Sequence, residues 1–410
     1  MKQRLIRFAG EKLLNGGEPV GPLTDEQELA CLSQRMPIEF YSTTYSSRKK
    51  EQQQVESHMR VCLKVLPGLE NMVTISPSEP ILSEAASDIM SKPNFDAPKA
   101  LQQVFRGFAV HRGDRGEFVV MLLFTLSRDK AILTRPPSTA NHRVFFVNDF
   151  LATLFKPAKK ILSMLPSVAC PKDSKSSLAT TFRDTRLHFN HFIKVHQHRM
   201  INRKYLVWFM TRGAAVLCGN SQAGVDGIIP YLFRGSCLHA SNVGGILWQC
   251  KAGGEFSDIP VPALFDAMDP VQLGIFDRLD GSEGVPVIRV VFALGAGPPS
   301  VKVLPLNTTQ TSYTAYDIWC SGVSSDCLAQ VAKIAEETWE SLVVASHGWQ
   351  DVYDASDRQT KALRMSMNPG AAENSSFWAA WSSPWDCCAV KSRFSYIMVV
   401  HYHYQSLNER

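Results

Sequence analysis

Several features that would place this chain in a specialised class are missing. The longest apolar run covers residues 118–126, about half of the ~20 residues that a membrane-spanning helix needs. Basic residues near the N-terminus are not followed by the apolar stretch of a signal peptide, which argues against secretion. Internal repeats are also missing, so a solenoid or propeller is excluded. The sequence therefore predicts a globular chain without a membrane span.

The ten cysteines lack the spacing of a metal motif or a disulfide framework. No two of them form a CxxC pair, which removes support for a zinc site built on thiolates. Cys218, Cys250 and Cys320 lie inside apolar runs, as buried free thiols do. We therefore expect a reducing, intracellular location, either nuclear or cytoplasmic.

What is present is an ordinary globular composition with an uneven distribution of charge. The 410 residues are 45% hydrophobic and 20% charged, and the net charge is +5, values typical of folded domains. Residues 101–212, however, hold 19 basic and 6 acidic side chains. Such a basic block is typical of a surface for phosphates or acidic partners, and nucleic acid, most simply DNA, is the expected partner. The alternative is a solvated face with local counter-charges.

Hydrophobic patterning predicts an α/β or α+β fold, with a mixed sheet flanked by helices. Strands are expected at 214–218, 225–233, 245–251, 286–294 and 315–320. Helices are expected at 1–14, from Thr24 onward, over 48–66 and 81–90, in the apolar segment after Glu117, and from a cap at 324–326 to about 344. The first segment starts as a fragment or a shortened copy of a longer protein would.

Five regions follow from this pattern. They are a helical N-terminal region (1–100), a core helix that carries Glu117 (101–129), a basic helical insertion (130–203), an α/β core (204–350) and an irregular tail (351–410).

Polar side chains at the ends of two apolar strands are the most informative local signal. Asp226 opens one expected strand, while Gln249 and Lys251 close the next and point to the same side of it. A lysine at the end of an apolar strand is costly without a partner. If the two strands pair as a hairpin, Asp226 and Lys251 meet at one end of the sheet.

Glu117 adds a second carboxylate at the first turn of a helix that is expected to be buried on nearly all sides. Carboxylates, an amide oxygen and water are the ligands that Mg²⁺ prefers. A metal held there polarises a phosphate and lowers the pKa of bound water. The residue types therefore suit metal-assisted hydrolysis of a phosphodiester.

These segments resemble the PD-(D/E)XK, or restriction-endonuclease-like, nuclease fold. The resemblance covers residues 116–117, 224–230 and 246–251. It implies that Glu117 and Asp226 bind Mg²⁺ or Mn²⁺, that Gln249 takes the third position, and that Lys251 is the catalytic lysine. The third position is Gln where an acid is usual, and about a hundred residues separate Glu117 from the first strand of the core. The chain also resembles uncharacterised protein families of mushroom-forming fungi.

Other interpretations of the same residues stay open. Lys251 can reach solvent, Asp226 can cap a turn and Glu117 can complement a helix N-terminus. His188, His191, His196 and His198 could serve zinc, but no HExxH pattern is present. We expect nucleic-acid contacts from a group of six basic residues: Arg183, Arg186, Lys194, Arg199, Arg203 and Lys204. Two functions follow, a metal-dependent DNA nuclease or a catalytically inactive member of the fold that binds nucleic acid or protein.

Overall fold

The structure is a computed structural model of the chain. It describes residues 2–346 apart from 18–20, 41, 43, 67–71, 109, 111, 136–142, 171–172, 220–221, 254–255, 277–284 and 308–311. Residues 1–347 form one compact unit. The tail predicted over 351–410 lies outside the described residues.

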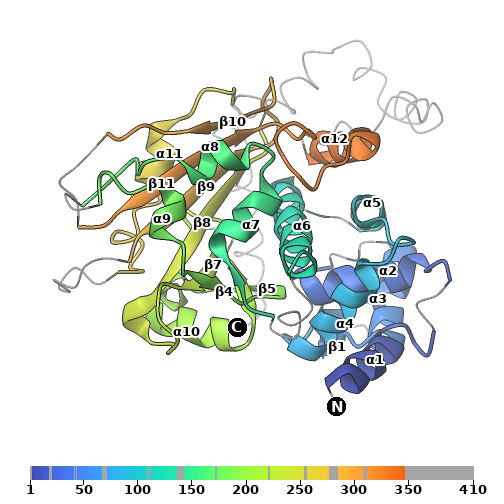
Figure 1. Cartoon of the computed structure of the whole chain (residues 1–410). Coiled ribbons are helices and arrows are strands. Elements are labelled where there is room, and N and C mark those ends of the chain that lie inside the picture. Colours follow the sequence, from blue (N-terminus) through green and yellow to red (C-terminus); the bar gives the residue numbers. More distant parts are fainter. Residues whose placement is uncertain are drawn as a thin grey trace, which may run out of the picture. The chain divides into compact units, whose positions relative to one another are not determined.

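Helices predominate in the first half of this unit and strands in the second (Figure 1). The helices are α1 (Lys2–Leu13), α2 (Asp25–Arg35), α3 (Tyr45–Ser57), α4 (Pro80–Met90), α5 (Ala97–Gly107), α6 (Arg112–Leu133), α7 (Val147–Leu154), α8 (Ala158–Leu162), α9 (Leu178–Thr181), α10 (Arg203–Thr211), α11 (Pro262–Asp266) and α12 (Glu336–Ser346), with short 3₁₀ turns at His198–Met200, Ala240–Asn242 and Lys333–Ala335. None of the described helices has both the length and the apolar character needed to cross a membrane.

The strands form two sheets. They are β1 (Val61–Val65), β2 (Met72–Ile75), β3 (Phe145–Phe146), β4 (Arg186–Leu187), β5 (His191–Lys194), β6 (Ala214–Leu217), β7 (Gly227–Leu232), β8 (Val243–Lys251), β9 (Val287–Ala293), β10 (Ser300–Val303) and β11 (Ala315–Ser321). β1 and β2 make a separate antiparallel pair, and the other nine strands of the described residues make one mixed sheet. β7 runs antiparallel to both β6 and β8, whereas β8, β9 and β11 run parallel to one another.

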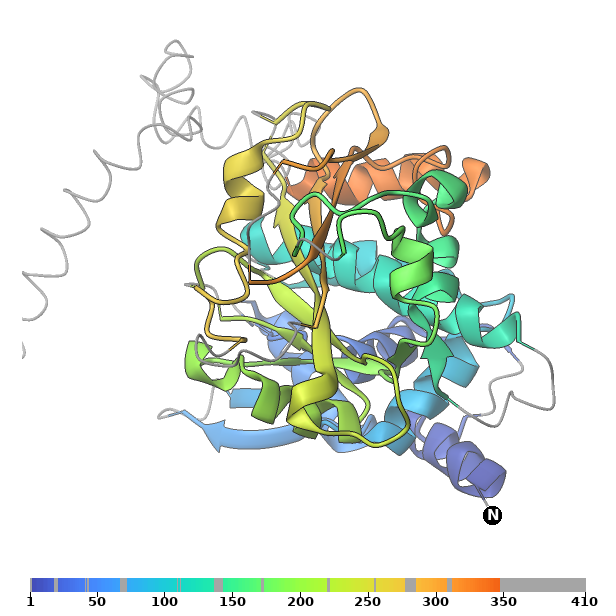
Figure 2. The same cartoon turned by 60° about the vertical axis from the view of Figure 1, so that its left-hand side comes forward.

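Helices cover the two faces of the large sheet differently. On one face, Phe124 of α6 contacts the rings of Trp248 in β8 and Phe292 in β9. On the other face, Arg289 of β9 donates to the Phe265 carbonyl of α11. Figures 1 and 2 show the strands passing between these two groups of helices. Side chains of β8 therefore alternate between the α6 face and the α11 face.

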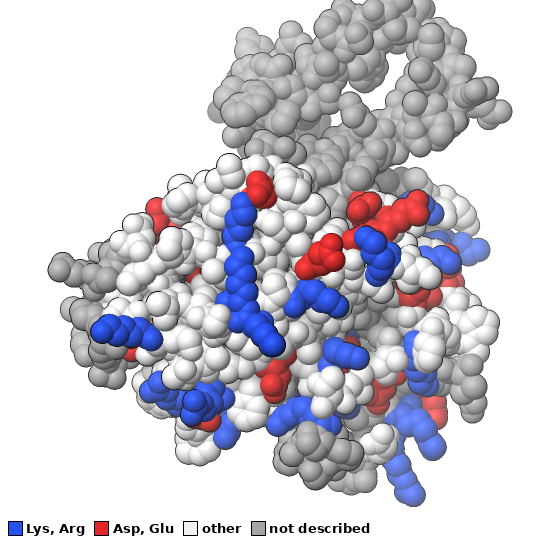
Figure 3. All heavy atoms as spheres, turned by 45° about the horizontal axis from the view of Figure 1, so that its top comes forward, with Lys and Arg blue, Asp and Glu red and all other residues white. Residues whose placement is uncertain are grey.

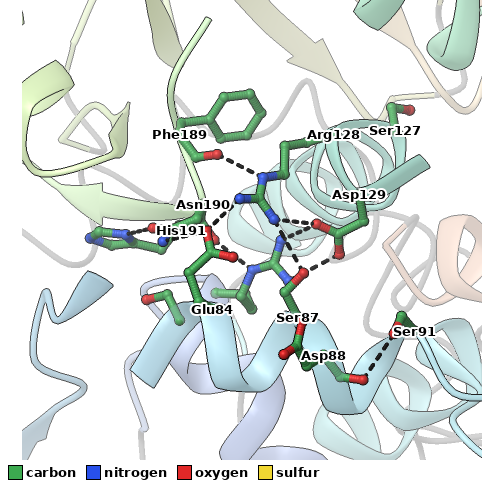
Figure 4. A network of polar contacts seen from close by, with 12 residues as sticks. Glu84, Ser87, Asp88, Ser91, Ser127, Arg128, Asp129, Phe189, Asn190 and His191 are labelled. Atoms are coloured by element: carbon green, nitrogen blue, oxygen red, sulfur yellow. Dashed lines mark hydrogen bonds and ion pairs between the residues drawn. The ribbon is translucent and has the colours of Figure 1, made fainter. Parts of the chain in front are cut away.

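A buried polar network joins the N-terminal helices to α6 and the start of β5 (Figure 4). Asp129 accepts two hydrogen bonds from Arg35, at 2.9 and 3.0 Å, and one from Arg128 at 2.8 Å. Arg128 also pairs with Glu84 at 2.5 Å and donates to the Phe189 carbonyl at 2.9 Å. Burial raises the pKa of Asp129, but the two guanidinium groups outweigh burial and hold it below its usual value. The ionised network thus fixes α2 and α4 against the sheet.

The mixed α+β class with flanking helices is confirmed, and so is each of the five predicted strands, as β6, β7, β8, β9 and β11. Three element predictions were wrong. The helix expected over 48–66 ends at Ser57 and gives way to β1, because Met59 has a positive φ of 61° that a continuing helix cannot contain. The helix expected from 324 begins at Glu336.

The third error concerns residues 130–203, which were expected to be an inserted basic region of helical pieces joined by loops. They contain α7, α8 and α9, but also β3, β4 and β5, which belong to the large sheet. β5 pairs in parallel with β6, and β4 pairs with β7. This segment supplies part of the sheet, so it is not an all-helical insertion.

Candidate functional site

Asp226 lies where the pairing of β7 and β8 ends. Gly224 has a φ of +82°, and a Cβ atom there would lie 2.1 Å from the Ala267 carbonyl oxygen, so only glycine fits this turn. The backbone N–H of Asp226 donates to the Trp248 carbonyl at 3.0 Å. Its carboxylate Oδ2 accepts the backbone N–H of Cys250 at 2.6 Å. The Asp226 side chain therefore terminates the ladder and is held at the end of β8.

Glu117 reaches the same end of the sheet from α6. A Cβ atom on the preceding Gly116 would lie 2.8 Å from the Cys250 sulfur, so the missing side chain lets α6 approach β8 closely. The helix begins at Arg112, which makes Glu117 its sixth residue. The prediction that Glu117 stands in the first turn was wrong. An interaction with the helix dipole therefore does not account for it, since that effect is confined to the first turn.

The two carboxyl groups influence each other electrostatically. Burial, followed by the negative charges of Asp226 and Asp114, raises the pKa of Glu117 to about 8, while Lys194 and Lys251 act in the opposite direction. Burial also raises the pKa of Asp226 to about 6, against the hydrogen bond from Cys250 and the charge of Lys251. The Glu117 carboxyl group therefore lies within electrostatic range of both Asp226 and Lys251.

No hydrogen bond or ion pair joins Glu117, Asp226 and Lys251 to one another in the described part of the chain. All three are half-buried. Two acids with raised pKa values beside a lysine, without direct contacts among them, are typical of a site that binds an additional charged group.

Gln249 lies on the other side of β8 from Cys250. Because Cys250 points toward Gly116 of α6, strand alternation directs Gln249 and Lys251 to the α11 face. Gln249 is 6% exposed, and its Oε1 atom has no hydrogen-bond partner. A buried amide oxygen without a partner is rare, since leaving it unsatisfied costs about 1–3 kcal/mol. Such an oxygen fits a cation ligand.

The described residues contain no group of three His, Cys, Asp or Glu side chains that could hold a metal ion. Glu117 and Asp226 supply two acidic ligands, whereas the Gln249 amide is directed to the opposite face of β8. Hard-ligand sites for Mg²⁺ use one or two carboxylates and complete their coordination with water and phosphate. The donor set therefore fits Mg²⁺ or Mn²⁺ and offers little to zinc.

Comparison with known proteins gave one family match, to a domain of unknown function, DUF8736, over residues 25–242. This match covers more than half of the 410 residues. The chain belongs to the DUF8736 family. No curated protein and no solved structure matched it.

The DUF8736 match includes part of the candidate site. It contains Glu117 and Asp226 and ends at residue 242, directly before β8. Gln249 and Lys251 lie beyond it. The family description assigns no activity, so the function of the site has to be argued from its chemistry.

The six basic residues predicted to contact nucleic acid lie in two places on this DUF8736 protein. Lys194 ends β5 beside the last residue of β6, and Arg199, Arg203 and Lys204 follow in the next loop and the first turn of α10. Arg186 pairs with Leu232 at the far end of β7, and the exposed Arg183 stands three residues before it. The predicted group is therefore divided between the two ends of the sheet.

Several of these basic side chains already have partners. Lys194 pairs with Glu39 at 2.7 Å, the Arg203 guanidinium lies 4.3 Å from the ring centre of Phe276, and Arg199 donates to Gln197 at 2.7 Å. Lys204 is exposed. Figure 3 shows one face of the molecule, on which basic side chains are spread out with acidic ones among them. Basic side chains therefore do not form a single continuous field on that face.

The histidine cluster has a structural role in its described part. His188 contacts the Met210 carbonyl at 3.0 Å, and His191 contacts Ser78 and Asn190 at 2.8 and 2.6 Å. Burial, followed by nearby arginine charges, lowers the pKa of His191 to about 3. A neutral histidine with both ring nitrogens engaged is not available to a metal.

Sequence analysis missed two groups that act on the site. Asp114 lies one helical turn before Glu117 and raises its pKa, and Lys194 lowers it. The three-residue spacing of Asp114 and Glu117 was visible in the sequence, since such residues are neighbours on a helix. The position of Lys194 near Glu117 was not visible in the sequence, because it depends on the unpredicted pairing of β5 with β6.

Proposed function

We propose that this chain is a metal-dependent, nuclease-like protein that hydrolyses phosphodiester bonds in DNA. The observation that carries the proposal is the pair of acids with raised pKa values, Glu117 and Asp226, at the sheet end that also holds Lys251. Two mutually repelling carboxyl groups are stabilised by a divalent cation, which removes the repulsion.

In this proposal Glu117 and Asp226 would hold Mg²⁺ or Mn²⁺. The bound cation supplies Lewis-acid polarisation of the phosphate and a more acidic water. Asp226 uses Oδ2 to accept the Cys250 N–H, so its Oδ1 is the oxygen available for binding. Both acids must lose their protons first. The Lys251 ammonium then stabilises negative charge that develops on the phosphate oxygens.

The arrangement of the elements supports the resemblance to the PD-(D/E)XK fold. Asp226 and the Gln249–Lys251 pair stand on neighbouring antiparallel strands, and Glu117 comes from a helix packed on the same strand end. The resemblance assigns Glu117 as its helix acid, Asp226 as its strand acid and Lys251 as its catalytic lysine. The chain carries a net charge of +5 at pH 7. This charge favours an anionic substrate, and so do the basic residues of the β5–α10 loop and Lys251.

A specific observation favours a second candidate, a catalytically inactive member of the same fold that binds nucleic acid or protein. Gln249 occupies the third position and is directed to the sheet face opposite Glu117. A neutral amide contributes no charge to cation binding. In this candidate, Asp226 serves only to cap the Cys250 N–H.

Cleavage of supercoiled plasmid DNA separates the two candidates. We expect nicking that requires Mg²⁺ or Mn²⁺ and stops with a chelator. Lys251→Ala should lower the rate by about 100-fold or more, the range lost when one group that stabilises transition-state charge is removed. Lys159→Ala, which changes an exposed lysine of α8, is the matched control and should leave the rate unchanged.

Nicking at an equal rate by Lys251→Ala, or nicking that persists without divalent cations, would contradict the nuclease proposal. A parent protein that binds DNA without nicking it in either metal would establish the second candidate instead.

A further inference from the structure

The outer face of α10 presents a tryptophan to solvent. Trp208 is 65% exposed, although tryptophan is usually among the most buried side chains by area. On the inner face of the same helix, Leu206, Phe209 and Met210 are buried against the sheet. The helix is thus firmly packed, and the exposed ring is not the result of a loose segment.

Neighbouring aromatic groups hold the Trp208 ring in place. Tyr205 lies one turn earlier, with its ring centre 5.7 Å from that of Trp208 and the two planes at 72°. Tyr205 in turn stacks near Phe209 at 6.3 Å. An edge-to-face contact of this kind fixes one edge of the indole and leaves a flat face open. The ring is therefore preorganised for stacking.

Cationic side chains flank the ring along the helix. Lys204 and Arg212 stand four residues before and four residues after Trp208, and both are exposed. Arg212 is anchored through hydrogen bonds to the Ser78 backbone and side chain. Lys204 and Trp208 lie four residues apart on the same face of α10, and Arg212 directly follows the last residue of the helix.

The surrounding sequence contains almost no negative charge. Between Asp184 and Glu255 the only acidic residue is Asp226 of the candidate site, while eight lysines and arginines fall in the same stretch. An aromatic ring between cations in a segment without acids is complementary to a polyanion that carries flat groups. A basic peptide would be repelled, and an acidic peptide does not carry a flat group beside every negative charge, as a nucleic acid does.

α10 starts at the end of the sheet that holds the candidate site and runs away from that end. β5 ends at Lys194, opposite the end of β6, where Cys218 donates to the Asp226 carbonyl at 2.7 Å. α10 starts beyond the loop at that end and runs back along the sheet to β6, and Arg203 in its first turn contacts Phe276. Phe276 lies in the segment after α11, so α10 shares the α11 face with Lys251. In Figure 2 both helices lie to the left of the strands.

We propose that Lys204, Trp208 and Arg212 form a stacking platform on α10 for an unpaired base of a nucleic-acid strand. This inference rests on the proposed function, because it assigns the strand beside the candidate site to the same substrate. Trp208 stacks on the base, and Lys204 and Arg212 contact the flanking phosphates. The substrate class is then a single-stranded or partly unpaired nucleic acid, not a fully paired duplex.

Binding measured in the presence of a chelator tests the platform apart from any cleavage. Fluorescence anisotropy of the full chain would use a labelled 12-nucleotide oligothymidine and a 12-base-pair duplex. Trp208→Ala should weaken oligothymidine binding by about 5- to 100-fold, the loss of one stacked base, and leave duplex binding within about twofold. Trp208→Phe should restore most of the affinity, since it keeps an aromatic face.

Lys204→Gln should weaken binding of the oligothymidine and of the duplex alike. The slope of log K against log salt concentration should become less negative by about 0.7–0.9, the value for loss of one phosphate contact. The control is Phe8→Ala, which removes another exposed aromatic side chain (56% exposed) with a lysine 5.4 Å from its ring centre. It should change neither affinity. Circular-dichroism melting establishes that each variant is folded.

Unchanged oligothymidine binding by Trp208→Ala, or an equal loss for both ligands, would overturn the platform. The platform would also be overturned if the parent protein were a dimer and Trp208→Ala a monomer with unchanged affinity for oligothymidine. The outer face of α10 would then be a protein interface. If Trp208→Ala weakens oligothymidine binding as expected but the parent protein does not cleave DNA with Mg²⁺, only the proposed nuclease function is rejected. If the parent protein cleaves DNA and Trp208→Ala binds oligothymidine normally, only the platform is rejected.

Discussion

The surroundings of Glu117 disfavour the ionised form of its carboxyl group. Its usual pKa of 4.5 is raised to about 8, first by burial and then by Asp226 and Asp114. At neutral pH the metal-free protein therefore holds this carboxyl group mostly protonated. A cation that binds here must displace that proton, which couples metal affinity to pH.

The raised pKa predicts a pH dependence of stability with a definite sign. A carboxyl group with a raised pKa in the folded state stabilises the fold fully below about pH 4.5 and loses this contribution as pH rises through about 8. The melting temperature of the metal-free parent should therefore fall relative to that of Glu117→Gln over this interval. Differential scanning calorimetry across pH 4–9 measures the difference between the two curves.

The matched control for this measurement is Glu340→Gln, which alters an exposed glutamate of α12. Its curve should run parallel to that of the parent. A Glu117→Gln curve that also runs parallel to the parent would mean that Glu117 is not destabilised in the folded chain. Addition of Mn²⁺ at pH 8.5 should raise the melting temperature of the parent and not that of Glu117→Gln.

At the scale of helices and strands, the sequence was most informative where burial is nearly complete. β7, β8, β9 and β11 are each rich in apolar residues that the sheet buries, so their pattern alone predicted them. The pairing of β7 with β8, which the sequence analysis could state only as a condition, is antiparallel. This pairing brought Asp226 and Lys251 to one end, as expected.

The missed elements owe their conformation to contacts that are distant in the sequence. β4 has two residues and β5 has four, His191–Lys194, too few for a periodicity to be recognised. β5 exists because it pairs with β6 and because Phe192 packs against Phe124 of α6. Likewise, the earlier start of α6 places two glycines in a helix, and Gly116 is favourable there only through its close approach to Cys250.

The candidate site was predictable in its residue types but not in its geometry. Asp226, Lys251 and Glu117 come together because α6 packs on the end of β8. Trp248 and Cys250 point toward α6, because Phe124 and Gly116 of that helix pack against them. Gln249 lies between them on β8 and therefore points to the other face of the sheet. Trp208 resembled the core residues beside it in sequence, and only the packing of α10 shows that it is exposed.

At the scale of the whole described unit, the buried ion network holds the N-terminal helices against the sheet. Arg128 has no exposed side-chain area and joins Glu84, Asp129 and the Phe189 carbonyl. Arg35 extends the network to α2 and to the Asn190 carbonyl. Residues from four elements therefore depend on the same charges, and the N-terminal region shares its polar core with α6 and β5.

Arg128→Met should be strongly destabilising, because it leaves Glu84 and Asp129 buried with fewer cationic partners. Breaking a buried pair from one side typically costs about 3–5 kcal/mol. Urea unfolding followed by circular dichroism measures this as a lowered midpoint. Arg183→Met, at an exposed arginine, is the control and should stay within about 0.5 kcal/mol. Equal midpoints for the two variants would show that the network contributes nothing to stability.

Divalent-cation binding by Glu117 and Asp226 together is the property on which the proposed function depends. Isothermal titration of Mn²⁺ into the protein at pH 8.5 tests it most directly, because both acids are then largely ionised. The account predicts one cation per chain and at least about tenfold weaker binding by Asp226→Asn, since ligand charge determines affinity for hard cations. Equal binding by the parent and Asp226→Asn, or no binding by the parent, would contradict the account.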